Sequence, residues 1–201
     1  ADVHQGEYVA ARDERLQWLT GFTGSAGFAI VLPGVAGVFI DGRYRTQVKG
    51  QVDLAHFTPV PWPEVKPADW IKAQLETGVI GFDPWLHTAD EIAKIEAALE
   101  GTDIRLQPCR NMVDAIWGDQ PAPPLGRAFA HPETLSGEAS QDKRARLADG
   151  LRRAGQRAAV LTLPDSICWL LNIRGADVPK NPIVHAFAVL HDDARVTLFA
   201  E

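Results

Sequence analysis

The sequence is short of cysteine, long apolar runs and clustered positive charge, and each shortage excludes a class of protein. Its two cysteines, Cys109 and Cys168, are far apart and have no CxxC spacing, so they indicate no zinc site. We expect two buried free thiols rather than a disulfide. No stretch approaches the roughly 20 apolar residues that span a bilayer. The net charge is −6 and basic residues occur singly, which argues against nucleic-acid binding.

The common catalytic and metal-binding patterns are also absent from the sequence. None of the histidines forms an HExxH motif. Gly21, Gly24 and Gly27 precede an expected strand, whereas a dinucleotide-binding loop follows a strand and opens a helix. Ser25 lies in Thr-Gly-Ser-Ala-Gly, which lacks the first glycine of the GxSxG nucleophile turn. We therefore predict no catalytic and no metal-ligating residue in this chain. The histidines stand at positions 4, 56, 87, 131, 185 and 191.

Helical and strand patterns alternate along the chain, which predicts an α/β fold. The apolar spacing predicts helices at residues 10–19, 44–49, 68–75, 89–99, 111–117, 141–154 and 166–171. Runs of apolar and β-branched residues predict strands at residues 28–32, 37–40, 54–58, 79–82, 104–107, 158–163, 183–190 and 196–199.

A proline-rich segment divides the chain. Pro121, Pro123 and Pro124 can continue neither a helix nor a central strand, so residues 121–126 are predicted to be a linker. This places a first domain at residues 1–120 and a second at residues 127–201.

The two predicted domains share a short repeat. Trp18-Leu19 followed by Gly24 recurs as Trp169-Leu170 followed by Gly175, and a predicted hairpin comes after each. The first copy continues well beyond its hairpin, whereas the sequence ends soon after the second. We therefore expect a tandem duplication with an incomplete second copy.

Asp41-Gly42-Arg43 is the strongest local candidate for a functional site. It follows a predicted strand, and α/β folds place ligands at strand ends. The competing interpretation is a turn in which Asp41 caps the following helix and Arg43 lies on the surface. Asn172, Arg174 and Asp177 form a second polar cluster, for which ordinary loop chemistry is the alternative.

Five segments together resemble aminopeptidase P, the Xaa-Pro aminopeptidase of the creatinase and prolidase superfamily. They occur in that family's order and nearly its spacing, and the likeness extends over essentially the whole sequence. The segments are residues 4–8 (HQGEY), 21–27 (GFTGSAG), 41–44 (DGRY), 113–117 (VDAIW) and 169–175 (WLLNIRG).

The resemblance implies two related ribonuclease H-like α/β domains, each with a mixed β-sheet flanked by helices, and then a catalytic pita-bread domain. Only the first domain and part of the second are expected here. The family's two manganese ions are held by two aspartates, a histidine and two glutamates of the missing catalytic domain, so the resemblance assigns no metal ligand and no cofactor to this chain.

One family role does fall on this sequence. The resemblance implies that Arg43 reaches from the first domain toward a proline-containing peptide substrate, where a guanidinium can pair with a carboxylate or a peptide carbonyl. Arg174 and Asp177 also match a family segment, and we expect them to serve domain packing.

The sequence is therefore interpreted as the non-catalytic front of a cytoplasmic, metal-dependent Xaa-Pro aminopeptidase, inactive alone, whose main partner is its own catalytic domain. Homo-oligomerisation of the full-length protein stays open. Two alternatives remain. One is a superfamily member without metal ligands that acts as a protein-interaction module. The other is a prolidase-like hydrolase, against which the duplication argues because such proteins usually have one front domain.

Overall fold

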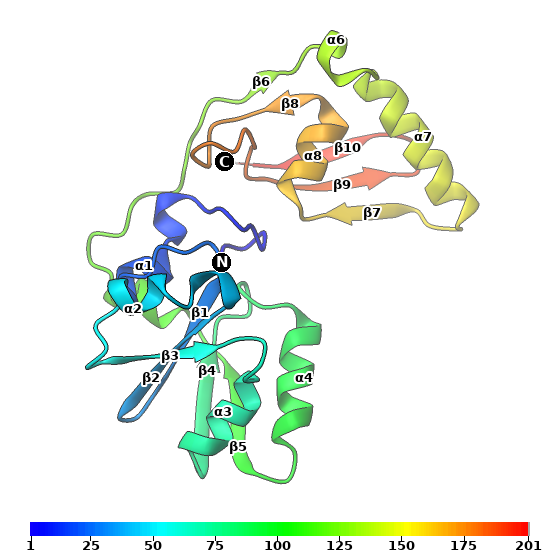
Figure 1. The fold of residues 1–201 in the computed structure, drawn as a ribbon. Helices are drawn as coiled ribbons and strands as arrows, with labels where there is room; N and C mark the ends of the chain where they lie inside the picture. Colours follow the sequence, from blue (N-terminus) through cyan, green and yellow to red (C-terminus); the bar gives the residue numbers. More distant parts are fainter. Residues whose placement is uncertain (201) are drawn as a thin grey trace. The chain divides into compact units, whose positions relative to one another are not determined.

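The computed structural model describes residues 1–200 and divides them into two compact units (Figure 1). Unit 1 comprises Ala1–Val3 and Asp13–Gln120, and unit 2 comprises His4–Arg12 and the chain from Pro121 onward. Residues 4–12, which we expected in the first domain, thus group with the second unit. The independence of the predicted domains, 1–120 and 127–201, stays a prediction. None of the helices in the described part of the chain is long and apolar enough to cross a bilayer.

Unit 1 contains five strands and most of the helices of the predicted α/β pattern. Its α-helices are α1 (Arg15–Thr20), α2 (Gln47–Gln51), α3 (Pro67–Gln74), α4 (Ala89–Leu99) and α5 (Met112–Ile116). Its strands are β1 (Gly27–Leu32), β2 (Val35–Ile40), β3 (Phe57–Pro61), β4 (Thr77–Phe82) and β5 (Asp103–Pro108). Short 3-10 turns occupy η1 (Ala11–Asp13), where the two units meet in sequence, and η2 (Gly42–Tyr44).

The first sheet of unit 1 is mixed, with β2 in its centre. Strand β1 runs antiparallel to β2 and places Phe28 opposite Phe39, whereas β3 runs parallel to β2 and places Pro61 opposite Ile40. Strands β4 and β5 form a separate parallel pair. The expected fold class, an α/β arrangement with a mixed sheet and flanking helices, is confirmed.

Strand β2 is buried on both faces. Val38, Phe39 and Ile40 are all buried, and successive side chains point to opposite sides of a strand. Phe39 is 0% exposed and packs on α3 through Trp70, with ring centroids 5.5 Å apart. On the other face, Val38 and Ile40 join Phe22 and Val48 in a second cluster. Helices therefore cover both sides of the sheet and fix the position of the end of β2.

The strand expected at residues 54–58 was misplaced, since β3 spans Phe57–Pro61. Two prolines in a run argue against a central strand, but β3 lies at the edge of its sheet. Trp62 donates its backbone N–H to the Ile40 carbonyl oxygen at 2.9 Å. By alternation, the nitrogens of Pro59 and Pro61, which carry no hydrogen, face the open edge.

Unit 2 is built around a three-stranded antiparallel sheet with the order β10-β9-β7. Its strands are β6 (Phe129–Ala130), β7 (Ala158–Leu161), β8 (Ile173–Arg174), β9 (Phe187–His191) and β10 (Val196–Phe199). Its helices are α6 (Glu133–Ser136), α7 (Ser140–Arg153) and α8 (Pro164–Leu171). The strand expected at residues 183–190 begins only at Phe187, because the preceding backbone bonds to the loop after α8, as when Asp177 N–H donates to the Ile183 carbonyl.

The predicted repeat is visible as the same local structure in both units. Helix α1 ends at Gly21 with φ 80°, and helix α8 ends at Asn172 with φ 50°, so each closes with a left-handed residue. A hairpin follows each helix, formed by β1 and β2 in one unit and by β9 and β10 in the other. The expectation of two tandem copies is confirmed.

The end of the proline-rich linker is bound to unit 2. Asp177, which is 8% exposed, accepts hydrogen bonds from the backbone N–H groups of Gly126 at 2.8 Å and His185 at 2.7 Å. Strand β6 then pairs with β8, and His131 N–H donates to the Asn172 carbonyl. A Cβ at position 126 would lie 2.4 Å from the Ala176 carbonyl carbon, so only glycine fits this close approach.

We predict that Asp177→Ala lowers the free energy of unfolding by roughly 1–3 kcal/mol, because two partly buried N–H groups lose their acceptor. Asp177→Asn, which keeps one carbonyl oxygen, should cost less. Urea denaturation of this chain measures both, and Asp119→Ala at an exposed position serves as the matched control. Equal stability of Asp177→Ala and the control would contradict the assigned role.

Candidate functional site

The Asp41–Arg43 segment lies directly after β2. In it, the Asp41 carboxylate and the Arg43 guanidinium form an ion pair with more than one hydrogen bond. Asp41 Oδ1 accepts from the Arg43 backbone N–H at 2.8 Å, which caps the η2 turn. Asp41 Oδ2 also accepts from Arg43 Nε at 2.9 Å and from Arg43 Nη2 at 2.6 Å. The capping role of Asp41 is therefore present, and the same carboxylate orients the guanidinium.

The Arg43 side chain is 61% exposed, so its guanidinium remains accessible to a ligand. Its terminal carbon lies 5.1 Å from the centroid of the Tyr44 ring. Tyr44 is in turn held by a 2.8 Å hydrogen bond between its hydroxyl and Ser25 Oγ, and by an edge contact with Phe22. The turn that presents Arg43 is thus supported from the buried side.

Sequence reasoning missed the Ser25–Tyr44 contact, although both residues lie in segments that carry the family resemblance. The Tyr44 hydroxyl also accepts from the Ser25 backbone N–H at 3.3 Å. Ser25 consequently helps to position the loop before β1.

The Asp41 pKa is lowered by its side-chain hydrogen bond to Arg43, with further lowering by the Arg43 backbone N–H. Because the folded-state pKa lies below the ordinary value, the pairing is complete above the ordinary pKa and is lost as the pH falls through the lowered one. The pair is exposed and screened by solvent, so it orients Arg43 and adds little to the stability of the fold.

The second polar cluster is used for internal bonds of unit 2. Asn172 Oδ1 accepts from Lys143 Nζ at 2.8 Å, and Asn172 Nδ2 donates to the Glu138 carbonyl at 2.9 Å. Arg174 Nη1 donates to the Ile173 carbonyl at 2.8 Å, and Asp177 fixes backbone as described above. These contacts support packing roles.

Lys143 is a buried cation that the sequence analysis did not single out. It is 1% exposed, donates to the Trp169 carbonyl at 3.0 Å and lies 4.5 Å from the centroid of the Trp169 ring. Carbonyls at a helix C-terminus favour a positive charge, so Lys143 on α7 caps the end of α8. Only its spacing among the buried positions of α7 could have indicated this.

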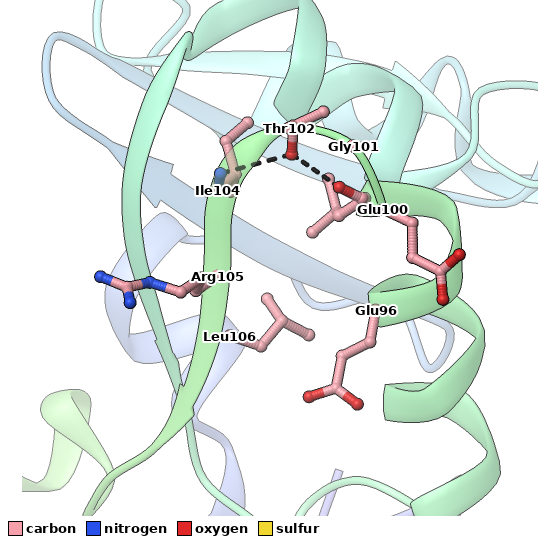
Figure 2. Close-up of a pocket in the computed structure, with 8 residues that line it drawn as sticks. Glu96, Glu100, Gly101, Thr102, Ile104, Arg105 and Leu106 are labelled. Atoms are coloured by element: carbon pink, nitrogen blue, oxygen red, sulfur yellow. Dashed lines mark hydrogen bonds between the residues drawn. The ribbon is translucent and has the colours of Figure 1, made fainter.

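A hollow of about 380 Å³ lies beside α4 and β5 (Figure 2). Glu96 and Glu100 border it, while the Arg105 side chain extends away from both carboxylates. Thr102 bonds to the Leu99 carbonyl and accepts from Ile104 N–H, which closes the turn between helix and strand. Its polar groups do not converge on a common point, so we assign no ligand to it. Within residues 1–200, no group of three or more His, Cys, Asp or Glu side chains is arranged to hold a metal ion.

Comparison with known proteins places these features in a family. A model of the creatinase/prolidase N-terminal domain matches residues 8–116, which is more than half of the chain, and a second model with the same description matches residues 119–201. The chain belongs to the creatinase/prolidase N-terminal domain family. Its two matches are in tandem, as the repeat predicted.

Individual relatives agree with the predicted resemblance to aminopeptidase P. The chain is 38% identical to a probable Xaa-Pro aminopeptidase P of Neosartorya fischeri over 94% of its length, and to one of Coccidioides posadasii over 97%. It spans only 30% and 31% of those two proteins. A crystal structure of X-prolyl aminopeptidase from Caenorhabditis elegans, described as a cytosolic enzyme with a di-nuclear active site, matches with a TM-score of 0.92 and 33% identity. That match covers 100% of this chain and 33% of the C. elegans chain.

We predict that Arg43→Ala raises the pKa of Asp41 toward its ordinary value, because the carboxylate loses its guanidinium donor. A carboxyl-carbon NMR titration of this chain measures the change. Asp193, whose pKa is lowered by Arg195 in unit 2, is an internal reference that should not move. An unchanged Asp41 titration in the variant would show that the pair does not form in solution.

Proposed function

We propose that this creatinase/prolidase N-terminal chain is the non-catalytic front portion of a metal-dependent Xaa-Pro aminopeptidase and helps to gate and position its peptide substrate. The observation that carries the proposal is the fixed, exposed guanidinium of Arg43 at the end of β2, in a chain that matches only about the first third of such enzymes. The reaction of the full-length protein would be removal of the N-terminal residue that precedes proline.

Arg43 has the chemistry that a substrate contact requires. Its fork is oriented by Asp41 through Nε and Nη2, which leaves Nη1 and the outer N–H groups directed away from that carboxylate. A peptide carboxylate or carbonyl oxygen can accept from such a fork, and the bond would limit the length and direction of the peptides that bind.

The described residues do not fit a di-nuclear metal centre, because no suitable cluster of ligand side chains occurs among residues 1–200. The two manganese ions that we expect would be held by the catalytic domain of the same polypeptide, and no step of the reaction is assigned to a residue of this chain. A cytoplasmic location is proposed from the C. elegans neighbour, which is described as cytosolic.

In the full-length protein, we predict that Arg43→Ala lowers kcat/KM for Xaa-Pro peptides by roughly ten- to a hundredfold, because a charge-assisted hydrogen bond to the substrate is lost. Metal content, measured by elemental analysis, should stay at the wild-type value. Steady-state kinetics with peptides of three to five residues test the change.

Two variants control for charge and for folding of the loop. Arg43→Lys keeps the charge without the two-pronged geometry and should recover only part of the activity. Arg45→Ala removes a neighbouring exposed arginine that pairs with Glu64, and it should leave kinetics near wild type. Wild-type kinetics in Arg43→Ala would refute the substrate contact.

A further inference from the structure

The glycine-rich segment at residues 21–27 forms a loop that reaches Tyr44 in the η2 turn. Phe22 lies at the base of this loop and is 1% exposed. A Cβ at position 24 would lie 2.2 Å from the Phe22 ring, so the chain passes over that ring only with glycine there. This close approach brings Ser25 to the Tyr44 hydroxyl, which bonds to both the backbone N–H and the Oγ of Ser25.

The same loop is also bonded to α2, the helix that follows the η2 turn. Thr23 N–H donates to Gln51 Oε1 at 3.1 Å, and Gln51 Nε2 donates to Thr23 Oγ1 at 2.8 Å. The loop is therefore attached at two points to the segment that carries Arg43, one of them at Tyr44 and the other at α2.

Three contacts set the orientation of the Tyr44 ring. Its hydroxyl is held by Ser25, and Phe22 meets it edge to face, with centroids 5.5 Å apart and an interplanar angle of 81°. The ring also packs against the buried cluster on this face of the sheet. Ordered in this way, it lies 5.1 Å from the guanidinium carbon of Arg43, a distance at which a cation is attracted to the face of an aromatic ring.

We propose that Tyr44 is a positioning residue for Arg43, and that the loop of residues 21–27 acts on the substrate contact through the Ser25–Tyr44 hydrogen bond. The inference rests on the proposed function of Arg43 and deepens it by assigning the residues that hold the contact in place. Asp41 bonds one edge of the guanidinium, which by itself lets the guanidinium plane turn about that edge. The Tyr44 ring attracts the face of the guanidinium and limits this turning, so that the peptide meets a donor that is already oriented.

A double-mutant cycle in the full-length protein tests the coupling between Tyr44 and Arg43. We expect Tyr44→Leu, which removes the ring, to lower kcat/KM for Ala-Pro-Phe by roughly two- to tenfold, the range expected for loss of one cation–π contact. In an Arg43→Ala background the same change should have no further effect, because the guanidinium that the ring positions is gone. Tyr44→Phe keeps the face of the ring and should recover part of the activity.

Phe57→Leu is the matched control for packing of the same cluster. Phe57 also packs against the buried residues on this face, but it lies opposite Ala36, at the other end of β2 from Asp41. Any loss of kcat/KM in this variant should be the same with and without Arg43. An equal loss in both backgrounds for Tyr44→Leu would show that the ring only stabilises the fold. That result overturns the positioning role and leaves the substrate contact standing.

Nitrogen-15 relaxation of Arg43 Nε in this chain gives a readout that needs no peptidase activity. In Tyr44→Leu the order parameter of the Nε–H bond should fall toward the values below about 0.6 that mark a flexible group, whereas Phe57→Leu should leave it unchanged. An unchanged order parameter in Tyr44→Leu overturns the inference. Wild-type kinetics in Arg43→Ala overturns the proposed function and this inference with it.

Discussion

Burial of β2 on both faces is the constraint on which the rest of unit 1 depends. Phe39 is enclosed by Phe28 and Trp70 on one side, and Val38 and Ile40 are enclosed on the other. A strand held in this way cannot slip by one residue without exposing one of these sets. The position of Asp41, and through it the direction of the Arg43 guanidinium, is therefore set by the core rather than by the loop itself.

Unit 2 contains the same succession of helix, left-handed cap and hairpin, but the polar side chains in this segment make different contacts. In unit 1 the segment after the helix leads to Ser25, which braces the Tyr44 ring below Arg43. In unit 2 the equivalent segment carries Asn172 and Asp177, whose polar atoms bind Lys143, the linker and nearby backbone. One copy of the repeat thus presents a cation to solvent, and the other anchors the connecting chain.

Local sequence signals predicted most of the fold. The β1–β2 hairpin follows from Pro33-Gly34 between two apolar runs, and α4 matches its prediction because Thr88 and Glu91 form a capping box. Features that depend on distant contacts could not be predicted. Strand β3 begins and ends later than predicted, because an edge strand tolerates the prolines that argued against a strand there. Residues 4–12 group with unit 2, where His4 Nδ1 lies 2.9 Å from the Thr162 carbonyl oxygen. Arg43 was found through its family segment.

The central claim is that this chain contributes substrate contact and no catalytic group. The most direct test is a peptidase assay of this chain alone on Ala-Pro-Phe with added manganese, with cleavage measured by release of free alanine. We predict no release above the rate of the peptide in buffer. A manganese-dependent activity that releases alanine and copurifies with the chain would contradict the account.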